Sequence, residues 1–330
     1  MIRIIDATLS MLDDYNLNEE KIYGFIELMG KIGIKNLQIS INTYYTLEGN
    51  LPDGFQYYLE IDPASYMNGI FPSEDENIKY FFVPKQQHRD KEIATYHIND
   101  LEDPLKGEAR SKEGLIKVIG LDNLILGGAN AGIEALKAQY NLNQLILCPE
   151  DTYHCATAIA VLFIQNKGYG VVSSMLGIGN KAATEQIILA LHVLERYMIN
   201  KTFCEMKEIK NWIEENFQIS IAPMTPVLGD KIFYVESGVH VDGILKKPTN
   251  YEPYAPELVG LERKIILGKH AGKNSVSYKL NELNLTGINQ NDLKNILEEV
   301  KHQSRLNGMD ITDQEFIKIV ERYGKNEKST

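Results

Sequence analysis

The side chains best suited to acid–base chemistry lie in a loop-rich stretch, residues 219–272. His240 and Tyr251 stand there among glycines, and an imidazole and a phenol can both take up and return protons. A structural use of the same residues is also open, with His240 as a hydrogen-bonded loop histidine and Tyr251 as a packed ring with a bonded hydroxyl. His270, in the motif Gly-Lys-His-Ala-Gly-Lys, is expected to order its loop.

A second set of candidate ligands, Cys148 and Glu150, follows a short apolar segment. Because side chains alternate along a strand, both point to one face and could in principle hold zinc. Each also has an ordinary use: Cys148 as a small apolar residue, and Glu150 with Asp151 as a cap for a helix expected to begin near Thr152. His154 then falls in the first turn of that helix and needs no ligand role.

The elements that must position these residues alternate between strands and helices. A strand over residues 2–5, a helix and a strand over 34–39 form a β–α–β opening, which predicts a parallel sheet. The helix is indicated by apolar residues at helical spacing, namely Ile22, Phe25, Ile26 and Met29. Further strands are expected over 124–126, 144–147 and 170–176, with helices over 130–140, 152–166 and 181–198.

The middle of the chain is harder to interpret. Strands are expected over 55–61 and 78–83, with no convincing helix between them. Repeated βα units rich in Val, Ile and Leu nevertheless predict an α/β fold, a (β/α)8 TIM-type barrel that typically takes about 250 residues. We place it in residues 1–200, which makes it minimal or degenerate, and expect a mostly helical C-terminal region over 201–330.

Three helices are expected in that C-terminal region. Apolar residues at helical spacing mark the first two, and a capping box of Thr312 with Glu315 begins the third. The expected buried faces are Met206, Ile209, Ile213 and Phe217; Leu293, Ile296, Leu297 and Val300; and Phe316, Ile319, Val320 and Tyr323.

Composition restricts the class of protein. The 330 residues are 44% hydrophobic, enough for a large core, and the net charge is −11. This charge argues against nucleic acid or an anionic membrane as partner, although a local basic pocket can still bind an anionic substrate. Three cysteines without metal-type spacing suit a reducing cytosol, and the N-terminus shows no signal peptide. We expect a soluble, cytoplasmic protein.

Three blocks of the chain resemble the isopropylmalate and homocitrate synthase family, in the correct order. They are Asp6-Ala7-Thr8-Leu9-Ser10-Met11; the segment from Cys148-Pro149-Glu150-Asp151-Thr152 to Gly177-Ile178-Gly179-Asn180-Lys181; and the region around His240 and Tyr251. Within this family, the chain most resembles the homocitrate synthases of nitrogen fixation. The resemblance implies that Gly177 and Gly179 form a tight turn near an acyl-CoA site.

The family's chemistry implies a divalent metal that polarises a 2-oxo acid while a base removes a methyl proton from acetyl-CoA. Here the arginine position of the family holds Ser10, and its acidic metal ligand is Met11. Cys148 and Glu150 replace its two histidines, and Thr184 replaces an asparagine. We therefore expect no metal or cofactor to be bound by this chain alone.

The third block keeps what the first two have lost. In the family, a histidine and a tyrosine from this region reach into the neighbouring subunit's active site, and His240 and Tyr251 match them with the family's spacing. Gly238, Asp242 and Gly243 are retained too, although Val235 stands where many relatives carry a histidine. The resemblance thus implies catalytic residues donated in trans.

These observations predict an omega-type subunit of a heteromeric homocitrate synthase, a Claisen-type acyltransferase that is inactive alone. An alpha-type partner, in a heterodimer or larger assembly, would bind the divalent metal and 2-oxoglutarate, with acetyl-CoA as co-substrate, and the homocitrate would serve nitrogenase cofactor assembly. Two alternatives remain open: a non-catalytic regulatory or scaffold paralogue, and an autonomous enzyme with altered chemistry at Cys148 and Glu150.

Overall fold

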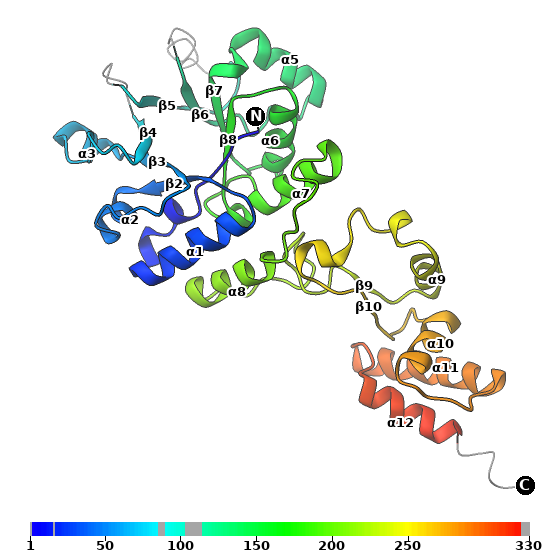
Figure 1. Ribbon diagram of the computed structural model, residues 1–330. Coiled ribbons are helices and arrows are strands. Elements are labelled where there is room, and N and C mark those ends of the chain that lie inside the picture. Colours follow the sequence, from blue (N-terminus) through cyan, green and yellow to red (C-terminus); the bar gives the residue numbers. More distant parts are fainter. Residues whose placement is uncertain (1, 16, 85–89, 103–113, 325–330) are drawn as a thin grey trace, which may run out of the picture. The chain divides into compact units, whose positions relative to one another are not determined.

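Eight parallel strands close into a barrel in the computed structural model, which describes residues 2–15, 17–84, 90–102 and 114–324 (Figure 1). Each strand pairs with the next along the chain, and β1 closes the ring against β8, with Ile5 opposite Val172. The strands are β1 (Ile4–Asp6), β2 (Asn36–Ser40), β3 (Gln56–Glu60), β4 (Ile78–Val83), β5 (Glu92–Ile98), β6 (Ile116–Gly120), β7 (Leu145–Pro149) and β8 (Gly170–Ser173). The predicted barrel fold is confirmed.

Helices cover the outside of this barrel, and several of them are short. They are α1 (Glu19–Lys31), α2 (Ile41–Thr46), α3 (Pro63–Asn68), α5 (Ala129–Gln139), α6 (Ala156–Gln165) and α7 (Thr184–Glu195). The predicted apolar face of α1 is buried, and Asn18 caps the helix by accepting a hydrogen bond from the Lys21 amide. In the described part of the chain, no helix lies between β4 and β5, so the barrel is minimal, as expected.

Some expected elements are wrong. Residues 124–126 form turns, with Leu126 N donating to Asn123 O, and the strand of that unit is β6. His154 lies before α6 in a turn with φ of 55°, because the helix begins at Ala156, whose amide donates to Asp151 Oδ1 at 2.9 Å. Asp151 therefore acts near the helix start as expected, while His154 does not belong to the first turn.

The first compact unit extends to Ile221, beyond the residue 200 at which we expected the barrel domain to end. The reason is α8 (Met206–Phe217), which packs against α1, with the Trp212 and Phe25 rings 4.6 Å apart between centroids. Its predicted buried face is confirmed. No helix in the described residues is long and apolar enough to cross a membrane.

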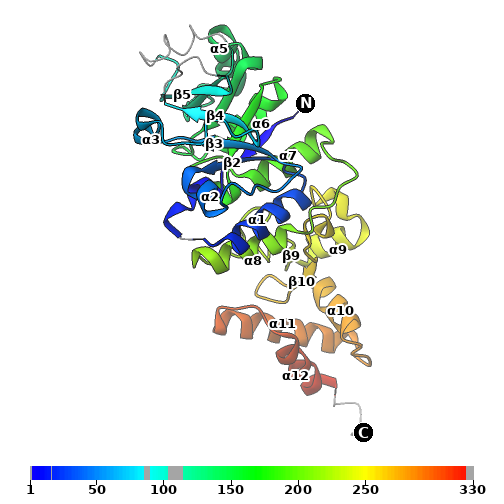
Figure 2. The same cartoon turned by 60° about the vertical axis from the view of Figure 1, so that its left-hand side comes forward.

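The second unit, residues 222–330, carries a two-stranded parallel sheet and four α-helices in its described part. They are β9 (Tyr234–Val235), β10 (Lys264–Ile265), α9 (Gly238–Lys246), α10 (Lys273–Glu282), α11 (Gln290–Asn307) and α12 (Asp313–Gly324). Helices α11 and α12 pack side by side, as Figures 1 and 2 show, and bury Ile296, Val300 and Phe316. The predicted capping box is present, with Glu315 N donating to Thr312 Oγ1.

Candidate functional site

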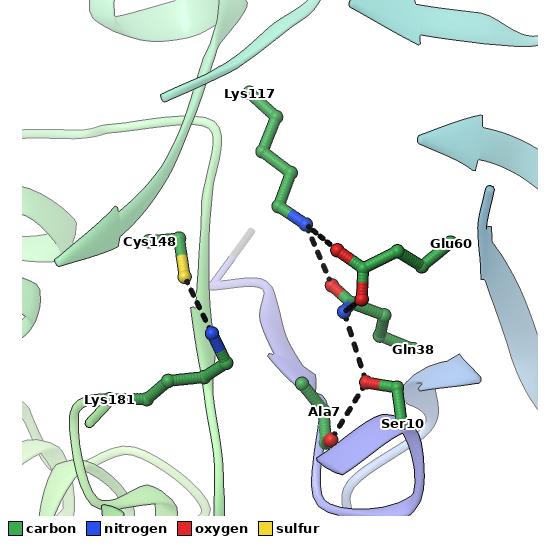
Figure 3. Close-up of polar contacts among 7 residues, drawn as sticks. All are labelled: Ala7, Ser10, Gln38, Glu60, Lys117, Cys148 and Lys181. Atoms are coloured by element: carbon green, nitrogen blue, oxygen red, sulfur yellow. Dashed lines mark hydrogen bonds and ion pairs between the residues drawn. The ribbon is translucent and has the colours of Figure 1, made fainter. Parts of the chain in front are cut away.

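A buried lysine is the centre of a polar network inside the barrel. Lys117 on β6 is 1% exposed, and its ammonium donates to Gln38 Oε1 at 3.1 Å and to Glu60 Oε1 at 3.3 Å (Figure 3). Gln38 Nε2 donates in turn to Glu60 Oε2 at 2.7 Å. The ammonium also lies over the Phe82 ring, 4.2 Å from its centroid. Residues from four strands thus hold one charge in a fixed place.

The charges in this network stabilise each other. The Lys117 ammonium holds the pKa of the Glu60 carboxyl below its usual value, against the opposing effect of burial. Gln38 is 1% exposed, and both its amide oxygen and its amide nitrogen are hydrogen-bonded. Because every member already has a partner, the network needs no ligand to satisfy it.

Ser10 extends this network to the loop after β1. Its hydroxyl accepts a hydrogen bond from Gln38 Nε2 at 3.0 Å and donates to Ala7 O at 2.9 Å. The residue at the family's arginine position is therefore a short, neutral side chain whose hydroxyl is already bonded on both sides. It offers no guanidinium fork to grip a carboxylate.

Cys148 is paired with a second lysine, Lys181. The Lys181 ammonium lies 3.6 Å from Cys148 Sγ, on the other side of the view in Figure 3. Burial acts to lower the pKa of Lys181, but the neighbouring Cys148, Glu60 and Glu150 outweigh it, so that this pKa is raised above its ordinary value. Glu150 contacts His97 as well, with Oε2 3.0 Å from Nε2.

The positions at which the family binds its divalent metal do not fit one here. Met11 offers a thioether, and Thr184 uses its hydroxyl to donate to Asp6 Oδ2 at 2.6 Å. Cys148 and Glu150 are in contact with Lys181 and His97 instead. Within the described residues, no group of three or more His, Cys, Asp or Glu side chains is placed to hold a metal ion. A hard divalent cation would find too few oxygen or nitrogen donors.

The glycine turn after β8 keeps an unusual backbone. Leu176, Gly177, Gly179 and Asn180 all have positive φ, between 58° and 75°. At Gly179 the φ of 75° favours glycine, and a Cβ there would lie 2.5 Å from Met11 Sδ, so the Met11 side chain would have to move. Glu185 holds the turn by accepting the Leu176 amide at 2.9 Å. Contact of this turn with an acyl-CoA stays a prediction.

Two fully buried carboxyl groups lie beneath this turn. Burial raises the pKa of Asp6 to about 6 and that of Glu185 to about 7, and hydrogen bonds to each group only partly offset the effect. Asp6 accepts from the Thr184 hydroxyl and from the Thr8 amide, and Glu185 accepts from the Leu176 amide. Their protonation therefore changes close to neutral pH.

His240 and Tyr251 lie together in the second unit. Their ring centroids are 6.0 Å apart, and both side chains are exposed, Tyr251 by 47%. His240 is on helix α9 and not in a loop, which corrects the structural alternative given above for this residue. Its neighbour Val239 is 78% exposed, so an apolar side chain accompanies the imidazole at the surface.

Glycines fix the position of this pair. A Cβ at Gly243 would lie 2.2 Å from the Tyr251 hydroxyl oxygen, so the absence of a side chain there makes room for the phenol. Gly238, at the start of α9, approaches Gly272 so closely that a Cβ would be 2.6 Å from the Gly272 Cα. Glu236 accepts a hydrogen bond from the backbone amide of His270 at 2.6 Å, so His270 orders its loop through its backbone.

Sequence reasoning missed Lys117, Gln38 and Glu60. The available signal was a single lysine inside the apolar strand Ile-Lys-Val-Ile-Gly, since a lysine is almost never buried without a partner. His240 and Tyr251 are brought together as expected, whereas Cys148 lies beside Lys181 and Glu150 contacts His97.

Similarity to known proteins extends over almost the full length of this chain in one relative and over parts of it in others. A family described as homocitrate synthase post-HMGL domain-like matches residues 227–307. The chain is 28% identical to the homocitrate synthase omega subunit of Clostridium pasteurianum, over 98% of this chain and 96% of that one. It is 36% identical to homocitrate synthase AksA of Methanocaldococcus jannaschii, over 51% of this chain and 43% of that one, so it spans under half of that relative.

Solved structures agree on the fold. The hydroxymethylglutaryl-CoA lyase of Pseudomonas aeruginosa superimposes with a TM-score of 0.50 at 12% identity, over 66% of this chain and 94% of the lyase. At that identity the likeness shows the barrel fold alone. Together, the barrel, the retained region around His240 and the full-length similarity show that the chain belongs to the isopropylmalate and homocitrate synthase family.

Proposed function

We propose that this chain is an omega-type subunit of a two-component homocitrate synthase, with no metal site of its own. An alpha-type partner would supply a barrel that binds the divalent metal and 2-oxoglutarate. This chain would supply His240 and Tyr251 to that barrel, and acetyl-CoA would be condensed with 2-oxoglutarate to homocitrate for nitrogenase cofactor biosynthesis.

One contrast within the molecule supports this proposal most strongly. Ser10 and Cys148, at positions where the family binds substrate and metal, are bonded to other residues of the barrel. His240 and Tyr251 are exposed instead, and among the described residues neither ring has a hydrogen-bond partner. Groups left open on the surface are available to a second protein, and those in the barrel are not.

The chemistry assigned to this chain is proton transfer. The His240 imidazole can accept a proton from the acetyl methyl group, and the nearby Tyr251 hydroxyl can donate a hydrogen bond to the thioester oxygen. Gly177 and Gly179 would accommodate the acyl-CoA chain at the turn after β8. These three roles are part of the proposal.

The test is homocitrate formation from acetyl-CoA and 2-oxoglutarate by the full-length chain, its alpha-type homologue from the same cell, and the mixture. We expect the mixture to be far more active than the sum of the two proteins alone. Comparable activity of this chain alone would contradict the missing metal site and would favour altered chemistry at Cys148 and Glu150.

A binding measurement separates the proposal from the scaffold alternative. If the two proteins form a complex whose activity equals that of the partner alone, this chain binds a synthase without taking part in catalysis. That outcome would overturn the catalytic role of His240 and Tyr251. Lack of both complex and activity would contradict the proposed partnership altogether.

A further inference from the structure

The second unit contains a pocket of about 870 Å³ for which the proposed proton transfer has no use. It is larger than a small 2-oxo acid requires and falls in the range of sites for drug-sized ligands. Its wall combines β9, β10, the end of α11 and the start of α12. The polar residues that line it include Lys231, Tyr234, Glu236, Lys264, Lys269, Lys279, Arg305, Asp310 and Asp313.

Positive charge prevails in this pocket once the internal pairs are set aside. Lys279 is bonded to Asp313 at 3.0 Å, so these two charges offset each other, while Glu236 accepts the His270 amide and keeps its negative charge. Four cations remain that have no ion pair within the described residues, Lys231, Lys264, Lys269 and Arg305, against two carboxylates, Glu236 and Asp310. A protein with a net charge of −11 has thus gathered cations from three separate segments, around residue 231, over 264–269 and at the end of α11.

An aromatic ring stands among these cations. The ammonium groups of Lys231 and Lys264 lie 6.0 Å and 5.7 Å from the centroid of the Tyr234 ring. Tyr234 and Lys264 are paired residues of the β9–β10 sheet, so the ring and one cation are held in register by backbone. A flat ring beside several cations suits a ligand that has both a base to stack and phosphates to bind.

We propose that this pocket binds the phosphate-bearing nucleotide end of coenzyme A. The inference rests on the proposed function, in which acetyl-CoA is the co-substrate. Lys and Arg side chains would bind the 3′-phosphate and the pyrophosphate, and the adenine would stack on Tyr234. Glu236, in the wall of the pocket, immediately precedes the segment that begins α9, so the pocket adjoins the helix that carries His240.

The test is calorimetric titration of the full-length chain alone with four probes: coenzyme A, 3′-dephospho-coenzyme A, pantetheine and inorganic pyrophosphate. We expect coenzyme A to bind most tightly, the dephospho form more weakly, and pantetheine not at all. Binding should weaken with added salt, because it is mainly ionic. Pantetheine binding as well as coenzyme A would overturn the proposal, and pyrophosphate binding equally well would overturn its nucleotide part.

Variants locate the binding. Lys231→Gln combined with Lys264→Gln should weaken coenzyme A binding by about tenfold or more, since two charge-assisted contacts are lost. The matched control is Lys294→Gln combined with Lys318→Gln, two exposed lysines on α11 and α12 outside the pocket, and this variant should bind as the wild-type protein does. Equal weakening in both variants would show a general charge effect and contradict the site.

This experiment fails separately from the proposed function, because it needs neither the partner nor turnover. Coenzyme A binding that is unchanged in the pocket variant, together with homocitrate formation by the mixture, would refute only the pocket. Binding that is lost in the pocket variant, without synthase activity in the mixture, would keep the pocket and refute the function.

Discussion

Polar side chains are buried and hydrogen-bonded to one another in the barrel interior, whereas those at the start of the second unit are exposed. In the barrel, Lys117, Gln38 and Glu60 bond to one another, and the lysine is fully buried. In the second unit, His240 and Tyr251 lie at the surface, and Gly243 leaves room for the Tyr251 ring. The barrel network satisfies its own hydrogen bonds, whereas the imidazole and the phenol of the second unit are held in place with their polar atoms exposed.

The difference teaches how a family's active site can be divided. A buried polar network is stable only when it is complete, so the buried charge of Lys117 depends on Gln38 and Glu60 together. An exposed pair costs little to keep, because water satisfies it until a partner arrives. A self-paired interior and an exposed pair of rings are therefore both physically reasonable in one chain.

Replacement of His240 should have the largest effect on activity. In His240→Ala, we expect homocitrate formation by the mixture to fall by about a hundredfold or more, as for a lost acid–base group. His302→Ala, on an exposed face of α11, is the matched control and should leave the rate unchanged. Equal rates for the two variants, with complex formation intact, would remove His240 from the reaction.

Lys117→Met tests the other region. It leaves the Glu60 carboxylate without its ammonium, and we expect the free energy of unfolding in denaturant titrations to fall by about 2 kcal/mol. The expected loss of stability is no larger because the Glu60 side chain is 35% exposed, so water screens its charge. Adding Glu60→Gln should restore much of the loss. Activity of the folded variant in the mixture should be unchanged, and a large decrease would show that this barrel takes part in the chemistry.

The buried acids predict a pH dependence of stability. Burial raises the pKa of Glu185 from 4.5 to about 7 and of Asp6 from 3.8 to about 6. Between those values the folded protein keeps protons that the unfolded chain has released. The free energy of unfolding should therefore fall as the pH rises from about 4 to about 7, and stay lower above that.

Glu185→Gln isolates half of this effect, because it removes the titration and keeps an oxygen to accept the Leu176 amide. At pH 8 we expect the variant to be more stable than the wild-type protein by about 3 kcal/mol, and by no more than about 1 kcal/mol at pH 5. Glu195→Gln, an exposed carboxylate that ends the same helix, is the control. A parallel pH profile for both proteins would refute the assignment.

The smallest expected effect on activity comes from a substitution at Gly243, beside the Tyr251 ring. Gly243→Ala places a Cβ where the Tyr251 hydroxyl now lies, and the exposed ring can move aside. Stability should change by less than about 1 kcal/mol, since alanine favours the helix, while the rate of the mixture falls by about three- to tenfold. Gly24→Ala in α1, where a Cβ has room, is the control. An unchanged rate would mean that the phenol's position is unimportant.

The long, regular elements of this fold could be predicted from the sequence. Helices α1 and α11 show apolar residues at helical spacing, and the (β/α) alternation indicated the barrel. Short elements were missed where their residues are polar. Strand β5 contains Glu92, Thr95 and His97, and α2 and α3 have only six residues each, so their caps at Ser40 and Asp62 were the main signals.

Site residues could be predicted where a local sequence spacing defines them, but not where contacts between distant segments define them. The positions of His240 and Tyr251 follow a local pattern, and the structure places their rings together. The network of Lys117 joins β2, β3 and β6, which are far apart in sequence, and no local pattern specifies such a meeting. The 124–126 strand was wrong because these apolar residues form consecutive turns, and α6 begins later than expected because His154 lies in a turn with positive φ.

The ammonium of Lys117 is tethered to the chain by its own side chain. A chelator cannot extract it, a shortage of metal in the cell cannot empty its place, and another ion cannot displace it. It also cannot exchange ligands or draw an incoming carbonyl into its coordination sphere, because its position is built in when the chain folds. This barrel interior therefore carries a permanent positive charge that needs no supply from outside the chain.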